Sequence, residues 1–495
     1  MNTKQVKNSK SLSLSLLILS LGISIFLCIV LWNINRESFW GDEAFSVYSI
    51  GGGGGEDNSS IKNAWDFSRF WRIILDDNHP FLYNLCLKIY AHYLGYSDFT
   101  LRFFSTLWIL FGALISYLLL YKHHYKILAL VYTLLFLLAP NTIYYAQECR
   151  NYAMLLSLAS IYCILLYLVF ESMRGALELK HKMWYFVGIF ICAVGMVLTH
   201  YYAYVFVFCT GILALIHSYH LKSNFYAFFI CFGLSALVGI LWVSIHHIYG
   251  GFLYRIDSEW TYKGSIYFLL FSTLLSALGK FGWAFVIILG IICLKQKGLA
   301  PYKKLFVFAY MIILELLCVT LIFTCISQTM TQRYFMEIYP LIYLLIASML
   351  LSFKRYLAYI VFGLIIILAL HGAYISTKYH KEDLAQASAY IAAHFDPKVC
   401  KLPVGWIAYT RYLPQFEAIE MPLMQEHCDL ILLSTAAEND VNFSRIKVFL
   451  HKYGISDGYE ILFFNGAIVV QKSPPTRLKE GKAIAEEAAT YFESQ

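Results

Sequence analysis

Long apolar blocks separated by short polar segments dominate this chain. The first block, residues 12–33, lies between the basic positions Lys4, Lys7 and Lys10 and the polar stretch 33–36. It is long enough to cross the hydrocarbon of a bilayer, which takes roughly 20 helical residues. A cleaved signal peptide would have a shorter apolar core and a small-residue cleavage site. The pattern therefore favours an uncleaved first span.

Further blocks of this kind predict about eleven crossings in all, each needing about 20 apolar residues. The run 265–294 is ambiguous, since it fits one crossing plus a helix in the interface or two short crossings; the first interpretation keeps the topology consistent. The other predicted spans are 100–121, 126–141, 152–170, 184–199, 201–219, 225–246, 278–294, 305–325, 336–352 and 356–374.

Composition agrees with this pattern, because 59% of the residues are hydrophobic, 14% are charged and the mean hydropathy is +0.61. These values exclude a soluble domain with a polar exterior. The chain is predicted to be an α-helical polytopic membrane protein.

Basic residues gather in alternate short loops, which the positive-inside rule assigns to the cytoplasm. The net charge of +7 is explained by these loops and implies no nucleic-acid partner. The N-terminus is then cytoplasmic, and the loops 34–98, 247–264 and 326–335 and everything after about 375 are extracytoplasmic. The basic positions are Lys4, Lys7, Lys10, Lys122, Lys126, Arg174, Lys180, Lys182, Lys222, Lys295, Lys297, Lys303, Lys304, Lys354 and Arg355.

The segment after the last span, residues 376–495, differs in composition from the predicted transmembrane domain, residues 1–375. An amphipathic pattern over 382–395, a short apolar run over 430–433 and two strand-like runs around Asn465-Gly466 predict a small α/β domain with a hairpin. A charged helical tail is expected from Lys479. Cys400 and Cys428 lie in this outer domain, where the spacing allows a disulfide but equally allows free thiols.

Acidic residues directly beyond a span are candidates for function, since an ionisable group beside a membrane is costly unless it is solvated, paired or used. Asp42 and Glu43 occupy this position in the segment 38–44. The alternative is a solvated loop edge or a helix N-terminus, which favours acids. A second polar cluster in the same loop, before Pro80 and a predicted short interfacial helix, holds Asp76, Asp77, Asn78 and His79.

Polar turns between later spans fall on the same predicted side. A guanidinium fork at Arg150 could bind a phosphate, although a structural pair with Glu148 is the alternative. Each such cluster alone resembles ordinary interfacial tyrosine or snorkelling arginine. The stronger argument for a functional site is that all of the clusters are predicted on the same side of the membrane. The chain has no His-x-x-x-His, Cys-x-x-Cys or Walker motif, so nothing in it indicates metal ligation or nucleotide hydrolysis.

The order of these clusters resembles the GT-C membrane glycosyltransferases, in particular the family-39-like group that includes protein O-mannosyltransferases and lipid A aminoarabinose transferases. The similarity covers residues 1 to about 395. It departs from the family at Phe81, where a second proline is usual, and at Cys149, where a small residue is common. The matching segments are Trp40–Glu43, Asn78–Tyr83, Ser97–Ser105, Gln147–Tyr152, His200–Tyr202 and Gln332–Tyr334.

The resemblance implies a polyprenyl-phosphate-linked sugar donor, presented on the outer leaflet, and inverting transfer to an acceptor hydroxyl on a glycan, a lipid or a protein. It also implies no cofactor and no catalytic metal, contact with membrane lipids, and a bacterial plasma membrane. Asp42 is expected to be the base and Glu43 to position substrate, with the two roles exchangeable. The donor phosphate and sugar are assigned to His79, Arg150, His200, Tyr201, Lys263, Arg333 and Tyr334, and positioning to Asp76, Asp77, Asn78, Tyr83, Gln147 and Glu148.

Two other classes of protein remain open at this point. A transporter or flippase of lipid-linked sugars would also need many spans and a lipid-phosphate site, but transporters commonly show repeated halves and broken helices at the bilayer midplane. A scaffold of a glycan assembly complex would use the outer domain without chemistry. The sequence shows no obvious repeat, and the charges are predicted at the outer ends of spans. Both observations favour an enzyme that acts on one side of the membrane.

Overall fold

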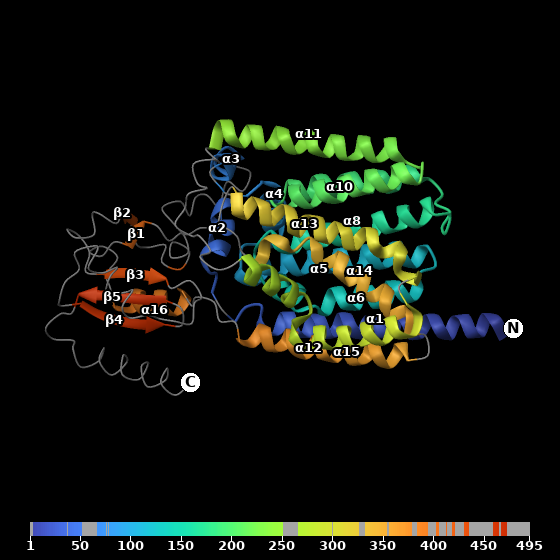
Figure 1. Cartoon of the computed structure of the whole chain (residues 1–495). Coiled ribbons are helices and arrows are strands. Elements are labelled where there is room, and N and C mark those ends of the chain that lie inside the picture. The colour runs from blue at the N-terminus through green and yellow to red at the C-terminus, as the bar shows by residue number, and fades with distance from the viewer. Residues whose placement is uncertain are drawn as a thin grey trace. The chain divides into compact units, whose positions relative to one another are not determined.

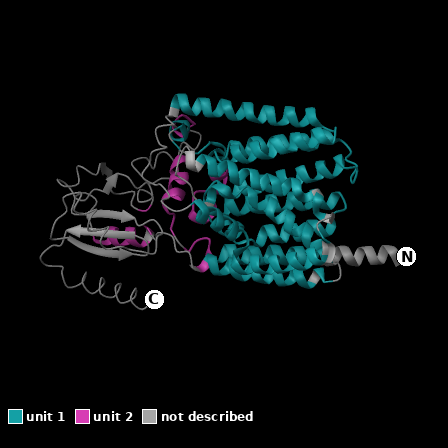
Figure 2. Cartoon of the chain, in the orientation of Figure 1, with its two compact units in different colours: residues 1–32, 71–89, 102–376 teal, residues 33–70, 90–101, 377–495 magenta. Residues whose placement is uncertain are grey.

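The computed structural model divides the chain into two compact units (Figure 2). Unit 1 comprises residues 1–32, 71–89 and 102–376, and unit 2 comprises residues 33–70, 90–101 and 377–495. The structure describes residues 3–36, 38–51, 67–75, 77, 79–250, 266–298, 300–325, 332–353, 356–378, 384–394, 402–404, 412, 418–420, 430–434, 459–464 and 467–472.

Helices account for nearly all of the described chain up to residue 394. They are α1 (Thr3–Asn33), α2 (Gly41–Ser49), α3 (Phe67–Leu75), α4 (Leu82–Leu94), α5 (Asp98–Lys122), α6 (Lys126–Leu138), α7 (Pro140–Ala146), α8 (Tyr152–Met173), α9 (Lys182–Val197), α10 (Ala203–His220), α11 (Phe225–Gly250), α12 (Ile266–Lys297), α13 (Phe306–Cys325), α14 (Ile338–Leu350), α15 (Leu357–Lys378) and α16 (Leu384–His394), with short 3-10 turns η2 (Ala300–Leu305), η3 (Gln332–Phe335) and η4 (Leu351–Phe353).

The chain is a multi-pass membrane protein. Among the described residues, eight helices are long and apolar enough to span a membrane, and the bent pair α6 and α7 makes a ninth if it counts as one span. Two shorter apolar helices, α9 and α13, lie where the sequence also predicts crossings. Every predicted span therefore has a helix at its place in the chain.

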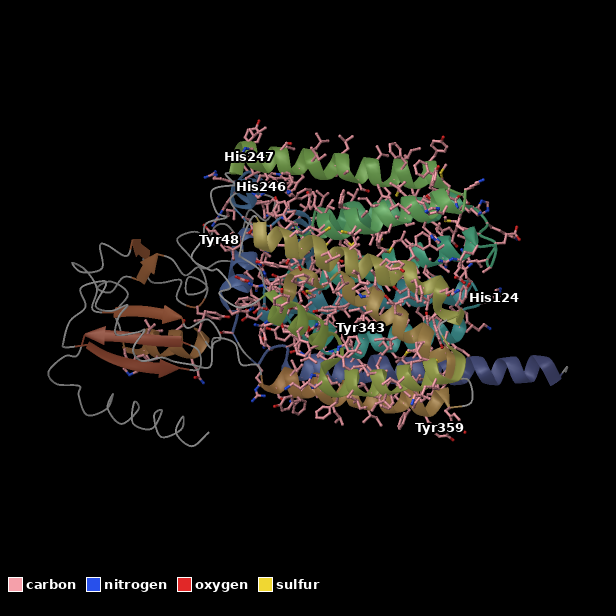
Figure 3. All side chains as sticks on the ribbon, viewed as in Figure 1. Tyr48, His124, His246, His247, Tyr343 and Tyr359 are labelled. Carbon is pink, nitrogen blue, oxygen red and sulfur yellow. The ribbon has the colours of Figure 1, made fainter. Side chains whose placement is uncertain are left out.

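Burial separates the helices of unit 1 into inner and outer ones. The apolar window of α8 is 100% buried, whereas that of α15 is 17% buried. Tyr343 on α14 is 0% exposed and Tyr359 on α15 is 79% exposed, as the side chains in Figure 3 illustrate. A helix in lipid satisfies its own backbone polar groups, so an apolar outer face needs no protein partner. Figure 1 shows α11 at one edge of the bundle and α1, α12 and α15 at the other.

Small residues and hydroxyls hold the inner helices together. A Cβ on Gly112 of α5 would lie 2.7 Å from the Cβ of Ser157 on α8, so the two backbones approach as only glycine allows. Ser160 of α8 is hydrogen-bonded to the hydroxyls of Ser116, on α5, and Tyr132, on α6, each at 2.8 Å. These bonds satisfy polar groups that would otherwise be orphaned in an apolar interior.

Two spans are interrupted. Pro140 disfavours helical geometry at Ala139, which is extended, and α6 and α7 meet at 59°. Gly279 has φ 71° and ψ 170° inside α12, so the ambiguous run 265–294 consists of two helical parts, the second of which covers the predicted span 278–294.

Unit 2 contains α2, α16 and all the described strands. These are β1 (Leu402–Val404), β2 (Ala418–Glu420), β3 (Leu430–Ser434), β4 (Tyr459–Phe464) and β5 (Ala467–Lys472). β1 and β2 pair in parallel, and β5 lies between β3 and β4 in an antiparallel sheet. Phe464 pairs with Ala467, which confirms the predicted hairpin. The tail from Lys479 lies outside the described residues.

Candidate functional site

Ring side chains from four separate segments of the chain meet around His200 in unit 1. The His200 ring centroid lies 5.5 Å from that of His79, in the loop before α4, and 5.4 Å from that of Tyr334, in η3. It lies 5.8 Å from Tyr152 and 5.9 Å from Tyr202. Tyr202 and Tyr334 stack at 4.5 Å with an interplanar angle of 14°. We call these five residues the ring cluster.

Two guanidinium groups flank the ring cluster. The Cζ atoms of Arg150 and Arg333 lie 6.0 Å and 5.8 Å from the centroid of the Tyr152 ring. Cation–π contact of this kind orients a guanidinium while its N–H groups remain directed elsewhere. The turn after α7 and the 3-10 turn before α14 thus place two permanent positive charges on one aromatic side chain.

His200 is neutral in this environment. Burial lowers its pKa well below the ordinary value, and the electrostatic influence of the neighbouring His79, Arg150 and Arg333 lowers it further. Its Nδ1 accepts the backbone N–H of Tyr202 at 3.3 Å. The neutral ring therefore carries its proton on Nε2, where it is a hydrogen-bond donor.

Asp77 orients His79. The Nδ1 of His79 lies 3.4 Å from one carboxylate oxygen of Asp77, and Asn84 Nδ2 donates to the other at 3.3 Å. Asp77 is buried and His79 is half-buried. Since Nδ1 faces the carboxylate, Nε2 is the nitrogen left to meet a ligand.

The turn that carries Arg150 is held by the helices around it. Ser105 Oγ donates to the carbonyl of Glu148, and Asn151 Nδ2 donates to the carbonyl of Thr199 at 2.8 Å. Tyr83 donates to Cys149 Sγ at 3.8 Å, and burial raises the pKa of its phenol well above the ordinary value. Tyr83 is therefore a neutral support of this turn.

Gln147 and Tyr201 lie beside the ring cluster and have other partners. Gln147 exchanges hydrogen bonds with Ser376 of α15, at 2.9 and 3.1 Å. Tyr201 stacks on His246 of α11 and bonds its Nδ1, and His246 Nε2 bonds the carbonyl of Leu75 at 3.0 Å. His246 is labelled at its end of α11 in Figure 3.

The structure adds Tyr152 and Tyr202 to the residues that sequence reasoning selected. Tyr152 lies in the motif segment 147–152 and Tyr202 in the motif segment 200–202. Their closeness in the sequence to the predicted site residues could therefore have identified them. Tyr201 and Tyr202 are neighbours just before α10, and successive helical positions differ by about 100° in direction. Only the packing of α10 decides which ring joins His200.

The predicted acids lie in unit 2, in the first turn of α2. Glu43 is 0% exposed and its carboxylate accepts the backbone N–H of Trp40 at 3.5 Å. Asp42 is partly exposed. Both acids interact favourably with the positive end of the helix dipole. Glu43 also caps the helix, because its carboxylate accepts the backbone N–H of the N-cap residue Trp40.

Five predicted positions lie outside the described residues, namely Asp76, Asn78, Lys263, Cys400 and Cys428. Within the described part of the chain, no group of three or more His, Cys, Asp or Glu side chains is arranged to hold a metal ion.

Solved structures show the same fold. ArnT from Cupriavidus metallidurans in the apo state matches with a TM-score of 0.62 at 10% identity, covering 94% of this chain and 100% of that one. The same protein bound to undecaprenyl phosphate matches with a TM-score of 0.60 at 10% identity, covering 93% and 99%. No family model and no curated protein sequence matches the chain.

An oligosaccharyltransferase of Archaeoglobus fulgidus, tethered to an acceptor peptide containing the NVT sequon, has a TM-score of 0.52 at 10% identity. The match covers 94% of this chain and 75% of that one. These neighbours are GT-C glycosyltransferases, and the chain has the polytopic fold of that superfamily, as its sequence motifs predict.

Proposed function

We propose that this protein is an inverting glycosyltransferase that moves a sugar from a polyprenyl-phosphate donor to an acceptor hydroxyl on the extracytoplasmic side of a bacterial plasma membrane. The observation that carries the proposal is the meeting of Arg150, Arg333 and neutral His200 around Tyr152. A lipid phosphate is the anion that such a membrane-protein site fits. The fold shared with an ArnT that binds undecaprenyl phosphate supports this choice.

The charge change of the reaction explains why two guanidiniums are useful. A polyprenyl-phosphate sugar is a phosphodiester with one negative charge. When the acceptor oxygen bonds to the anomeric carbon, the bond from that carbon to the phosphate oxygen breaks, and its electron pair leaves with the phosphate. The lipid phosphate gains a second negative charge, so preorganised cations stabilise the transition state more than the ground state.

The histidines suit the same phosphate. His200 donates from Nε2 and His79, oriented by Asp77, presents its own Nε2. Hydrogen bonds to a charged acceptor are stronger than neutral ones. We assign Arg150, Arg333, His79, His200 and Tyr334 to the donor phosphate or its sugar. Because two guanidiniums supply the positive charge, the proposal includes no catalytic metal.

Asp42 is the proposed base that takes the acceptor proton. The two acids of α2 differ in their surroundings, since Glu43 is fully buried with its carboxylate on the Trp40 N–H whereas Asp42 is partly exposed. A general base must reach the proton that it removes. Glu43 then has a structural role, in which its hydrogen bond to Trp40 stabilises the first turn of α2.

The test is a transfer assay with the purified, reconstituted protein, a panel of polyprenyl-phosphate sugars, and envelope lipids, glycans and peptides as acceptors, in buffer containing EDTA. Release of polyprenyl phosphate together with a glycosylated acceptor is the expected result. Mass spectrometry of envelope glycans from cells with and without the gene would name the sugar and the acceptor. Movement of the donor across vesicles without release of the phosphate would support a flippase instead.

A further inference from the structure

The hydroxyl of Tyr412 joins two segments that are far apart in the sequence. It accepts the backbone N–H of Phe39 at 2.8 Å and donates to the carboxylate of Asp98 at 2.9 Å. The separations along the chain are 373 and 314 residues. All three residues belong to unit 2.

A second bond joins the same stretch to α16. Ser38 Oγ accepts the backbone N–H of Leu384, the first residue of that helix, at 2.8 Å. Both residues are buried, and the first N–H groups of a helix have no partner within it. Residues 38 and 39 are therefore each bonded to the segment after the last span.

These two bonds lie directly before the helix that carries the acids. Trp40 precedes α2, its carbonyl accepts the N–H of Ala44 at 2.9 Å, and Asp42 follows Phe39 by three residues. Phe39 lies two residues before α2, so an anchored Phe39 amide constrains where the helix starts and, through its first turn, the direction of Asp42. A misplacement of 1 Å can lower a reaction rate about 100-fold.

We propose that Tyr412 is a positioning residue, through which the segment 377–495 holds the start of α2 and so aims Asp42. The hydroxyl suits this task because it donates and accepts at once. Asp98 takes its hydrogen, which turns an oxygen lone pair toward the Phe39 N–H. The effect of this contact on turnover rests on the proposed function, whereas the contact itself does not.

The first measurement is hydrogen–deuterium exchange on the full-length protein in detergent micelles. Tyr412→Phe keeps the ring and removes both bonds, so exchange in peptides spanning 38–44 should accelerate about 5- to 10-fold, as expected for the loss of one net hydrogen bond. Asp98→Asn keeps an acceptor and should change exchange less. Tyr93→Phe, on an exposed ring of the same unit, is the matched control. Unchanged exchange at 38–44 in Tyr412→Phe would overturn the proposal.

The second measurement separates positioning from general stability. In the transfer assay, Tyr412→Phe should lower kcat about 10-fold or more and leave donor affinity within about 2-fold, and Asp98→Asn should lower kcat less. Equal kcat in wild type and Tyr412→Phe, with accelerated exchange, would refute the aiming of Asp42. If the wild type transferred no sugar, the proposed function would fail while the exchange result still decided the contact.

Discussion

The two acids at the start of α2 are neighbours with different surroundings. Asp42→Asn should lower sugar transfer by about 10²- to 10⁴-fold, because a general base contributes about that much. Glu43→Gln keeps an acceptor for the Trp40 N–H and should lower transfer much less. Initial rates with the purified variants at saturating donor make the comparison. An Asp42→Asn enzyme as fast as wild type would show that the base lies elsewhere.

Arg333 lies over Tyr152 beside the ring cluster, where the donor phosphate is proposed to bind. Arg333→Ala should weaken binding of polyprenyl phosphate by roughly 10- to 100-fold, the range expected for a hydrogen bond to a charged group. Arg333→Lys keeps the positive charge but loses the two-pronged guanidinium geometry. Its affinity for polyprenyl phosphate should therefore lie between those of the wild type and Arg333→Ala. Titration of lipid phosphate against the protein checks this, with exposed Arg36→Ala as control. An affinity unchanged in Arg333→Ala would remove this residue from the phosphate site.

His200 makes stability depend on pH in a defined direction. Its pKa is held well below the ordinary value of 6.5 by burial and by nearby positive charge. As pH falls through about 6.5, the unfolded chain takes up a proton that the folded chain does not, so the free energy of unfolding decreases. The maximum slope from one such group is about 1.4 kcal/mol per pH unit.

Thermal unfolding between pH 7.5 and pH 5 tests this expectation. The wild type should lose stability below about pH 6.5, and His200→Asn should lose less over the same interval. His124→Asn, at an exposed histidine, should follow the wild type. Parallel curves for wild type and His200→Asn would show that His200 is not the group responsible.

At the scale of the element, the break in α12 depends on one glycine. Gly279 has a positive φ, and a Cβ there would lie 2.3 Å from Nε2 of His371 on α15. Gly279→Ala should destabilise the protein by about 1–3 kcal/mol from the backbone conformation alone, because this combination of φ and ψ is essentially restricted to glycine, with a further cost for moving His371.

A matched substitution lies in α11. A Cβ on Gly233 meets no atom within 4 Å, so Gly233→Ala should be neutral or stabilise by up to about 1 kcal/mol, because alanine is the better helix former. Melting temperatures of the two variants give the comparison. Equal stability of Gly279→Ala and wild type would mean that α12 can straighten without cost.

At the scale of the whole molecule, the alternation of spans predicts sidedness. His124 and His247 are exposed and lie at opposite ends of the bundle (Figure 3). In intact cells or spheroplasts, an impermeant maleimide should label His247→Cys directly and His124→Cys only after permeabilisation, because the positive-inside rule predicts that the basic loops are cytoplasmic. The parent protein, with its native cysteines, provides the background. The reverse labelling would invert the topology.

The sequence by itself determined the membrane class, the positions of the spans, the α/β character of the segment after the last span and most of the residues now found near His200. The physical reason is local in each case. A span needs a fixed length of apolar residues because backbone polar groups cannot remain unsatisfied in lipid, and a two-residue turn fixes the register of its hairpin.

Only the tertiary structure decided which side chains meet. It placed Tyr202 rather than Tyr201 on Tyr334, since the direction of a ring depends on the packing of its helix. It distinguished Asp42 from Glu43 by burial, which no pattern in the sequence records. It joined Tyr412 to Phe39 and Asp98. Contacts between segments hundreds of residues apart leave no periodic trace in either, because they arise only when the chain has folded.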